Sequence, residues 1–300
     1  MPQPIPSHTP DGRPYRIFFV CGHMRSGTNW VSALLNLHPD INCVGEGPLG
    51  HICSTVEAVK KLDYLYTSRE PHCTALDEAF YEMSRRVVLS LTCCKPSAAW
   101  VGDNTSRQFW MYLPDSSNFY ILRDGRDVLT SWTFHQLRID FAIGEPYRSR
   151  MAPLLERFRS DRDYFKAHPE ELLSDERWVR DTARYWKAFH RTGQEAMARI
   201  ERGEMPIRVC PLRYEGLVAD AEGQRQRMYR FLELDPALAE PLSAESKTAA
   251  GFTEGKADSF YRSGKIGDWK NYANDNFRRW FKEEAGEALI EAGYEQNTNW

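Results

Sequence analysis

The chain has 300 residues, of which 42% are hydrophobic and 13% aromatic, enough for a packed core, so gross disorder is excluded. The formal net charge is −3, so no overall basic field indicates a nucleic-acid partner, and any anion site must be built locally. Seven cysteines, an odd number without metal-binding spacing, favour free thiols in the reducing cytoplasm.

The N-terminus is expected to be a short flexible arm. Residues 1–15 are rich in proline and polar residues and lack the apolar segment of a signal peptide. No stretch approaches the roughly 18 apolar residues of a membrane-spanning helix. We therefore expect a single domain over residues 16–300, located in the cytoplasm and without a membrane span.

From residue 16 onwards, short apolar runs alternate with amphipathic segments. Strands are predicted at 16–21, 41–44, 98–103, 117–124 and 207–212. Helices are predicted at 27–37, 54–66, 74–92, 126–137, 214–234 and 276–293, with a helical insertion at about 133–203 and a loop-rich segment at 235–274. This alternation is typical of the α/β class, in which helices flank a central parallel sheet.

Polar or glycine-rich segments fall where the predicted strands end. In a parallel sheet the carboxyl ends of the strands meet at one edge, and ligands bind there. We therefore expect one cleft to be formed by CGHMRSGTNW, VGEGP, GDNTSR, LRDGRD and PLRYEG.

The segment CGHMRSGTNW (21–30) has the outline of a phosphate-binding loop, with Gly22 and Gly27 between a strand and a helix. A Walker A loop has Lys and Ser/Thr after its second glycine, whereas this chain has Thr28 and Asn29. Arg25 supplies a charged fork, and the helix N-terminus favours an anion. Enzymes that transfer a γ-phosphate use the lysine and a magnesium ion held by the Ser/Thr hydroxyl. Since this loop lacks both residues, it suits the transfer of a less charged sulfuryl group.

Two further segments indicate anion binding. LRDGRDVLTSW places Arg123 at the end of a strand and Ser131 eight residues later, where both side chains can contact a phosphate. RSGKIGDWKNY combines a cation, a hydroxyl and a flexible backbone at residues 262–264. Each segment alone is more often a solvated turn, but three such segments in one chain favour an anion site.

Together these segments resemble the sulfotransferases that use 3′-phosphoadenosine 5′-phosphosulfate (PAPS) as donor. CGHMRSGTNW is similar to their 5′-phosphosulfate loop, LRDGRDVLTSW to their 3′-phosphate motif, and RSGKIGDWKNY to the R-K-G-x-x-G-D-W-K-N tail of the cytosolic branch. Arg25 replaces the lysine of the cytosolic enzymes, so the front half is more similar to tyrosylprotein and bacterial sulfotransferases. The resemblance implies a P-loop-like α/β fold. It also implies a reaction that releases 3′-phosphoadenosine 5′-phosphate (PAP) and requires no metal.

The resemblance also implies which residues bind the donor. The 5′-phosphosulfate, the adenine and the 3′-phosphate are each assigned a group of residues: Arg25, Ser26, Gly27, Thr28 and Asn29 for the first, Trp30, Tyr214 and Phe252 for the second, and Arg123, Ser131, Arg262, Ser263 and Gly264 for the third.

Transfer to a hydroxyl, or alternatively to an amine, needs a base near the acceptor and a cation near the leaving phosphate. Arg25 is the candidate cation. Glu46 lies in an L-x-x-H-P…G-E context similar to that of tyrosylprotein sulfotransferases, and the resemblance implies that it is the base. His51 and His135 are the rival bases. Asn104 stands where relatives often have a lysine near the sulfuryl group, and its neighbour Asp103 serves the acceptor or caps a helix.

Two other functions fit parts of the sequence: a small-molecule P-loop kinase, and a non-catalytic nucleotide-binding protein on the same fold. The missing Walker residues argue against the kinase, and the intact front motifs argue against the non-catalytic protein. The acceptor stays open among small molecules, lipids, glycans and peptides, and a homodimer stays open as well.

Overall fold

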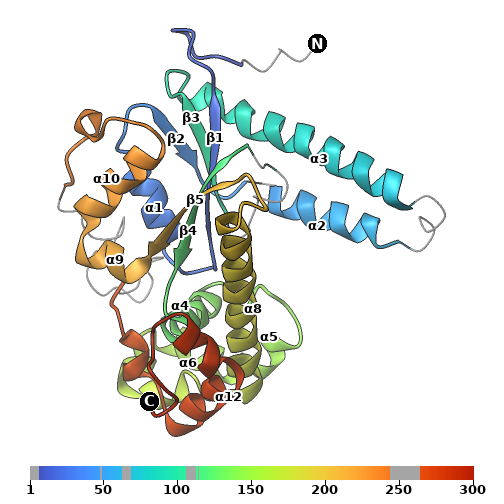
Figure 1. Cartoon of the computed structure of the whole chain (residues 1–300). Coiled ribbons are helices and arrows are strands. Elements are labelled where there is room, and N and C mark those ends of the chain that lie inside the picture. Colours follow the sequence, from blue (N-terminus) through green and yellow to red (C-terminus); the bar gives the residue numbers. More distant parts are fainter. Residues whose placement is uncertain (1–6, 48, 63–68, 106–112, 114, 244–263) are drawn as a thin grey trace. The chain divides into compact units, whose positions relative to one another are not determined.

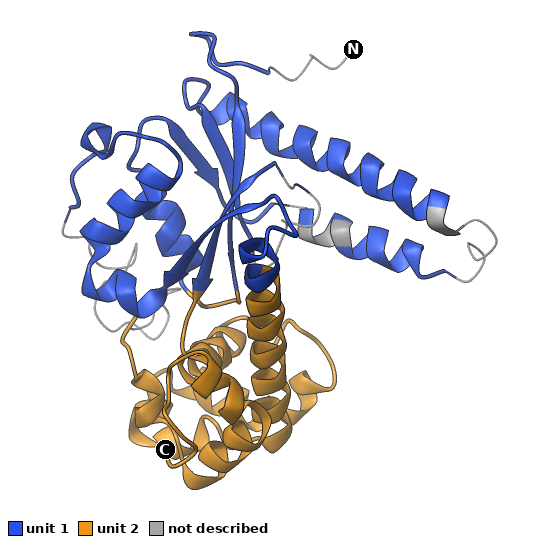
Figure 2. Cartoon of the chain, in the orientation of Figure 1, with its two compact units in different colours: residues 1–22, 27–121, 197–247 blue, residues 23–26, 122–196, 248–300 orange. Residues whose placement is uncertain are grey.

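The structure is a computed structural model that describes residues 7–47, 49–62, 69–105, 113, 115–243 and 264–300, with only the backbone described at 50, 51, 53, 69 and 70. The chain divides into two compact units (Figure 2). Unit 1 comprises residues 1–22, 27–121 and 197–247, and unit 2 comprises residues 23–26, 122–196 and 248–300. The predicted single domain over 16–300 therefore consists of two units that the chain enters more than once.

Unit 1 is built on a five-stranded sheet with the strand order β2-β3-β1-β4-β5. The strands are β1 (Arg16–Gly22), β2 (Ile41–Val44), β3 (Trp100–Thr105), β4 (Ser117–Leu122) and β5 (Arg208–Arg213). β1 pairs in parallel with β3 and β4, and β2 pairs in parallel with β3. The central parallel sheet expected from the sequence is confirmed.

Helices cover both faces of this sheet, as the continuous apolar run of β1 requires, because residues 18–21 have no exposed surface. On one face α1 (Thr28–Leu35) contacts α10 (Ala221–Phe231). On the other face α3 (Arg69–Ser90) contacts β1 and β3 and pairs with α2 (Leu49–Lys60), as Figure 1 shows. The remaining elements of unit 1 are η2 (Leu91–Cys94), α9 (Tyr214–Ala219) and η5 (Pro236–Leu238).

The register of the sheet brings the carboxyl ends of its strands to one edge. Cys21 of β1 lies opposite Thr105 of β3, and Val44 of β2 lies opposite Asp103. β1 is the central strand, and the chain continues from it to β2 on one side before returning to β4 on the other. This is the switch point at which open α/β sheets bind ligands.

Two sequence predictions need correction in unit 1. Residues 104 and 105 were expected in a loop, but they belong to β3, because their pairing with β1 satisfies the backbone and their side chains are buried. The single helix expected over 214–234 is two helices, because the side chain of Asp220 accepts the N–H of Gly223 at 2.8 Å and caps α10.

The described part of the predicted N-terminal arm contacts unit 1. Residues 1–6 lie outside the described residues, whereas Arg13 forms an ion pair with Asp40 at 2.8 Å and Tyr15 is buried. No described helix combines the length and the apolar character needed to cross a membrane.

Unit 2 contains most of the predicted helical insertion, together with the helix that precedes it and the C-terminal segment. Its elements are α4 (Gly125–Arg138), α5 (Tyr147–Arg150), α6 (Ala152–Ser160), α7 (Tyr164–Ala167), η4 (Pro169–Glu171), the larger part of α8 (Glu176–Glu201), η6 (Asp268–Asn271) and α12 (Asp275–Glu291). A core of aromatic and aliphatic side chains from α4, α6, α8 and α12 holds them together. Arg126 lies between the rings of Trp269 and Trp300, 4.1 and 4.4 Å from their centroids.

Candidate active site

The loop between β1 and α1 requires both of its glycines. A Cβ on Gly22 would lie 2.6 Å from the side chain of Ile121 and 3.0 Å from its carbonyl oxygen. Gly27 has a φ of 100°, and a Cβ there would lie 2.6 Å from the ring of Tyr214. The backbone of this turn therefore packs directly against β4 and α9, as a close phosphate-binding turn would.

Ser26 is the buried polar residue of this loop. Its side chain has no exposed surface, and its Oγ has no hydrogen-bond partner among the described residues. Thr28 and Asn29, in the first turn of α1, are half-buried, and no side chain caps this helix at Gly27. A buried hydroxyl without a partner and the uncapped N–H groups of a helix N-terminus are each donors that fit an oxyanion.

In unit 2, Arg25 and Ser131 contact each other, although the sequence assigned them to different phosphate groups of the donor. The Nε of Arg25 donates to the Oγ of Ser131 at 3.2 Å, and Arg25 has a left-handed φ of 68°. The Nη1 of Arg123 donates to the carbonyl of Arg25 at 3.1 Å. The loop and the predicted 3′-phosphate motif therefore meet through Arg123, which is 7% exposed.

The tail motif lies against the same group. The Nη2 of Arg123 donates to the carbonyl of Lys265 at 3.3 Å, and Gly264 has a φ of 60°. The predicted residues Phe252, Arg262 and Ser263 lie outside the described residues. Of the predicted tail residues, only Gly264 can therefore be placed, and it precedes the residue that Arg123 contacts.

Asp127 is a residue of this site that the sequence reasoning missed. Its carboxylate accepts the backbone N–H of Gly267 at 2.8 Å and that of Trp269 at 3.0 Å. Burial raises the pKa of Asp127, while the charge of Arg123 lowers it. The signal in the sequence is its position in LRDGRD, in the first turn of the helix that begins two residues after Arg123.

In unit 1, Trp30 and Tyr214 contact each other edge to face, with ring centroids 5.8 Å apart. Both rings are buried. The sequence assigned both to the adenine, and the structure brings the two together beside Gly27.

The candidate base also lies in unit 1, at the carboxyl ends of β2 and β3. Glu46 is exposed, and the next residue, Gly47, donates its N–H to the carboxylate of Asp103 at 3.1 Å. Beside Asp103, the Nδ2 of Asn104 donates to the Oδ1 of Asn29 at the start of α1. Two consecutive residues of β3 therefore contact the segment that carries Glu46 and the first turn of α1.

The histidines differ from Glu46 in their surroundings. Burial, followed by the charges of Arg25 and Arg138, lowers the pKa of His135 to about 4, and its Nδ1 lies 2.9 Å from the Nη2 of Arg138. Since arginine only donates, Nδ1 is the acceptor in this contact. For the rival His51, only the backbone within α2 is described.

His23, inside the loop, was not singled out by sequence reasoning. Burial lowers its pKa to about 4, its Nδ1 donates to the carbonyl of Met24 at 2.8 Å, and its ring packs on Tyr185 and Phe189. It therefore shapes the loop as a neutral, buried ring. In the sequence, its position between Gly22 and Gly27 is the feature that could have indicated a role in the loop.

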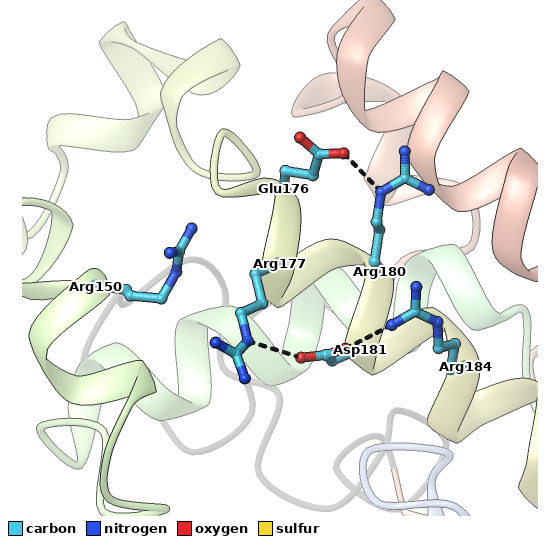
Figure 3. A pocket seen from close by; sticks show the side chains of 6 residues that line it. All are labelled: Arg150, Glu176, Arg177, Arg180, Asp181 and Arg184. Atoms are coloured by element: carbon cyan, nitrogen blue, oxygen red, sulfur yellow. Dashed lines mark hydrogen bonds and ion pairs between the residues drawn. The ribbon is translucent and has the colours of Figure 1, made fainter.

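A separate pocket of about 380 Å³ opens on unit 2 (Figure 3). It is lined by Arg150, Glu176, Arg177, Arg180, Asp181 and Arg184. Each arginine faces a carboxylate: Arg177 and Arg184 share Asp181, Arg180 contacts Glu176, and Arg150 contacts Asp175. This pocket therefore presents neutralised ion pairs and none of the predicted site residues.

The fold is that of an α/β protein of the P-loop type. A model of the sulfotransferase family matches residues 18–238, which is most of the chain. The chain therefore belongs to the sulfotransferase family, and the prediction of a PAPS-dependent sulfotransferase is confirmed at the level of the family. No curated protein sequence matches the chain.

Several solved structures are similar to the chain at low identity. Mouse sulfotransferase SULT7A1 complexed with PAP is 15% identical, with 93% of this chain and 85% of that chain covered and a TM-score of 0.43. A sulfotransferase from Alicyclobacillus acidocaldarius is also 15% identical, with coverage of 84% and 98% and a TM-score of 0.42. The sulfotransferase domain of the Synechococcus PCC 7002 olefin synthase is 16% identical, with coverage of 95% and 98% and a TM-score of 0.43.

Proposed function

We propose that this sulfotransferase binds PAPS through the loop between β1 and α1, together with Arg123 and Ser131, and transfers its sulfuryl group to an acceptor hydroxyl. Glu46 is the base and Arg25 the cation at the leaving phosphate. The observation that carries this proposal is the pair Asp103–Asn104, which contacts the segment of Glu46 on one side and Asn29 of the loop on the other. Both contacts are made by consecutive residues at the carboxyl end of β3.

The donor fits the residues present. In unit 2, the buried Oγ of Ser26 and the guanidinium of Arg25 can contact the oxygens of a phosphosulfate. In unit 1, the N–H groups of the first turn of α1 offer the same kind of donor. The buried Oδ1 of Asn104 has no partner among the described residues, while its Nδ2 is directed at Asn29. Asn104 therefore supports the loop and keeps a polar group near the reacting end.

The proposed reaction is an in-line displacement at sulfur. The acceptor oxygen forms a bond to sulfur while the bond from sulfur to the bridging phosphate oxygen breaks, and that oxygen keeps the electron pair. Glu46 takes the acceptor proton and later releases it to water. The charge that develops on the leaving 5′-phosphate is stabilised by Arg25 and the loop N–H groups, so PAP and the sulfated acceptor are the products.

Glu46 is preferred to His135 as the base for a reason of hydrogen bonding. The Nδ1 of His135 already accepts from Arg138, and the low pKa of its ring leaves it a weak proton acceptor. Glu46 is exposed and follows β2 at the edge where the strands end. His135 therefore acts as a neutral neighbour of Arg25 and takes no part in proton transfer.

The donor is tested by calorimetric titration without metal, comparing PAP with ADP, and then with ATP plus Mg²⁺. We expect a strong preference for PAP. Arg123→Ala should weaken PAP binding by about 10- to 100-fold, because it removes hydrogen bonds to a charged group. Arg279→Ala, at an exposed residue of α12, is the control and should leave binding unchanged. Equal binding of ADP, or binding of ATP only with Mg²⁺, would favour the kinase instead.

The base is tested with radiolabelled PAPS and a panel consisting of 4-nitrophenol, an aliphatic alcohol, an aminosugar and a tyrosine peptide. Glu46→Gln should retain PAP affinity and lower turnover of the best acceptor by about 10²- to 10⁴-fold, the range of general-base catalysis. Wild-type turnover in this variant would remove Glu46 from its role. PAP binding without any sulfated product across the panel would favour the non-catalytic alternative.

A further inference from the structure

Asp103 is a buried carboxyl group that the proposed reaction does not itself use. Its side chain belongs to a residue that is 2% exposed, in β3 between Val44 of β2 and Phe19 of β1. Both of its oxygens lie within hydrogen-bond distance of one donor, the N–H of Gly47, at 3.1 and 3.2 Å. A buried carboxyl group is costly unless it is hydrogen-bonded, so this contact holds strand and loop together.

Of the two glycines in the loop that carries Glu46, only Gly47 packs closely against this carboxyl group. A Cβ on Gly47 would lie 2.5 Å from the Oδ2 of Asp103, whereas a Cβ on Gly45 would meet no atom within 4 Å. The two glycines flank Glu46 directly. Gly47 is therefore the residue through which the loop rests on β3, and Gly45 is not.

The ionisation of Asp103 depends on its neighbours. Burial raises its pKa to about 7, the N–H of Gly47 opposes this shift, and the charge of Glu46 adds to it. Cys43 also faces Asp103, and burial raises the pKa of its thiol to about 12, so it stays protonated. Glu46 is therefore the charged group that faces Asp103 from β2 and its loop.

We propose that Asp103 is a positioning residue for the base: its carboxyl group fixes the Gly45–Gly47 loop through the N–H of Gly47 and so sets the place of Glu46 relative to the loop that binds the donor. The inference rests on the proposed role of Glu46. An ionised Asp103 is the stronger acceptor for this N–H. The loop is therefore held more tightly when Asp103 loses its proton, which makes the placement of the base sensitive to pH near neutrality.

The test compares four variants with the wild type. Asp103→Ala removes the acceptor, Asp103→Asn keeps an amide oxygen but no charge, and Gly47→Ala introduces the clash with Asp103. Gly45→Ala is the matched control, because it adds the same methyl group two residues away in open space. Three quantities are measured: hydrogen exchange of the Gly47 amide, PAP affinity, and turnover of the best acceptor from the panel.

We expect Asp103→Ala and Gly47→Ala to speed exchange at Gly47 and to lower turnover about 10- to 100-fold, with PAP affinity unchanged within twofold. Gly45→Ala should behave as the wild type. After correction for intrinsic exchange, protection of the wild-type Gly47 amide should rise between pH 6 and 8, and Asp103→Asn should lose this rise while keeping most of the protection.

Unchanged protection in Asp103→Ala would overturn the inference, even with Glu46→Gln inactive. A loss of turnover in Gly45→Ala equal to that in Gly47→Ala would overturn it too. Should Glu46→Gln turn over normally, the proposed base fails, and the positioning role fails with it. Hydrogen exchange still distinguishes a failure of the base from a failure of loop anchoring, because exchange at the Gly47 amide is measured without any acceptor substrate.

Discussion

The carboxylate of Asp127 accepts the backbone N–H of Trp269 at 3.0 Å, so the helix after β4 and the distant tail motif form one structure. The neighbouring Gly267 donates to the same carboxylate at 2.8 Å. Arg123 contacts the carbonyl of Lys265 from the same side of this motif. The two segments that the sequence assigned to one phosphate group are therefore held together by the carboxylate of Asp127 and the guanidinium of Arg123.

Asp127→Asn should weaken PAP binding. An asparagine oxygen can accept one of the two N–H groups, but its NH₂ group then faces the other donor, so the tail turns away from Arg123. We expect the dissociation constant of PAP to rise about 10- to 100-fold, consistent with the loss of one hydrogen bond to a charged group. The measurement is calorimetric titration. Asp275→Asn, at an exposed aspartate of α12, is the control, and equal affinities in both variants would contradict the assignment.

Gly27→Ala should destabilise the protein more than Gly12→Ala. Both glycines have a left-handed φ, 100° and 86°, so each substitution costs about 1–2 kcal/mol of backbone strain. At Gly12 the new Cβ meets no atom within 4 Å, whereas at Gly27 it meets Tyr214 at 2.6 Å. We expect a further loss of about 1–3 kcal/mol at Gly27 from this overpacking. Urea unfolding measures both, and equal losses would show that Tyr214 moves freely.

Arg25 combines strain with function. Its φ of 68° is unfavourable for any residue with a Cβ, so Arg25→Gly should be more stable than Arg25→Ala by about 1 kcal/mol. Both variants lose the guanidinium that contacts Ser131, and we expect both to lose turnover. Thermal unfolding and the radiolabel assay test this pair. Arg25→Ala unfolding at a higher temperature than Arg25→Gly would rule out backbone strain at this position.

His23 should make the protein sensitive to acid. Burial lowers its pKa from 6.5 to about 4, so the folded protein binds fewer protons than the unfolded chain between these values. The free energy of unfolding therefore falls as the pH drops from about 6.5 towards 4. His23→Phe keeps the contacts with Tyr185 and Phe189 and removes the titration. This variant should lose about 2–3 kcal/mol less than the wild type between pH 7 and 4.

The measurement is urea unfolding of both proteins at a series of pH values. Part of the acid sensitivity should remain in His23→Phe, because the pKa of His135 is lowered in the same way. Parallel stability curves for wild type and variant would show that His23 titrates alike in the folded and unfolded chain.

The sequence predicted best those elements that local pattern determines. The apolar runs RIFFV and FYIL became β1 and β4, because strands buried on both faces are continuously apolar. Asn104 and Thr105 looked like loop residues because both are polar. They extend β3 because the parallel partner strand satisfies their backbone, which no local pattern reveals.

The residues of the candidate site likewise divide into those that a local sequence pattern indicates and those that it does not. Arg123 and Ser131 were predicted as a pair from their spacing and Arg25 from the loop, and the structure brings the three into contact. Asp127 was missed because its role depends on N–H groups about 140 positions further along the chain. A lone aspartate in a helix carries no local sign of such a partner.

The central place of β1 in the sheet also affects how the protein folds. β1 is the central strand, yet its two neighbours in the sheet, β3 and β4, begin only at Trp100 and Ser117. Pairing between parallel strands so distant in sequence forms slowly and leaves apolar surface open to aggregation until it is complete. The loop that follows β1 can therefore take its final structure only after two strands far along the chain have joined the sheet.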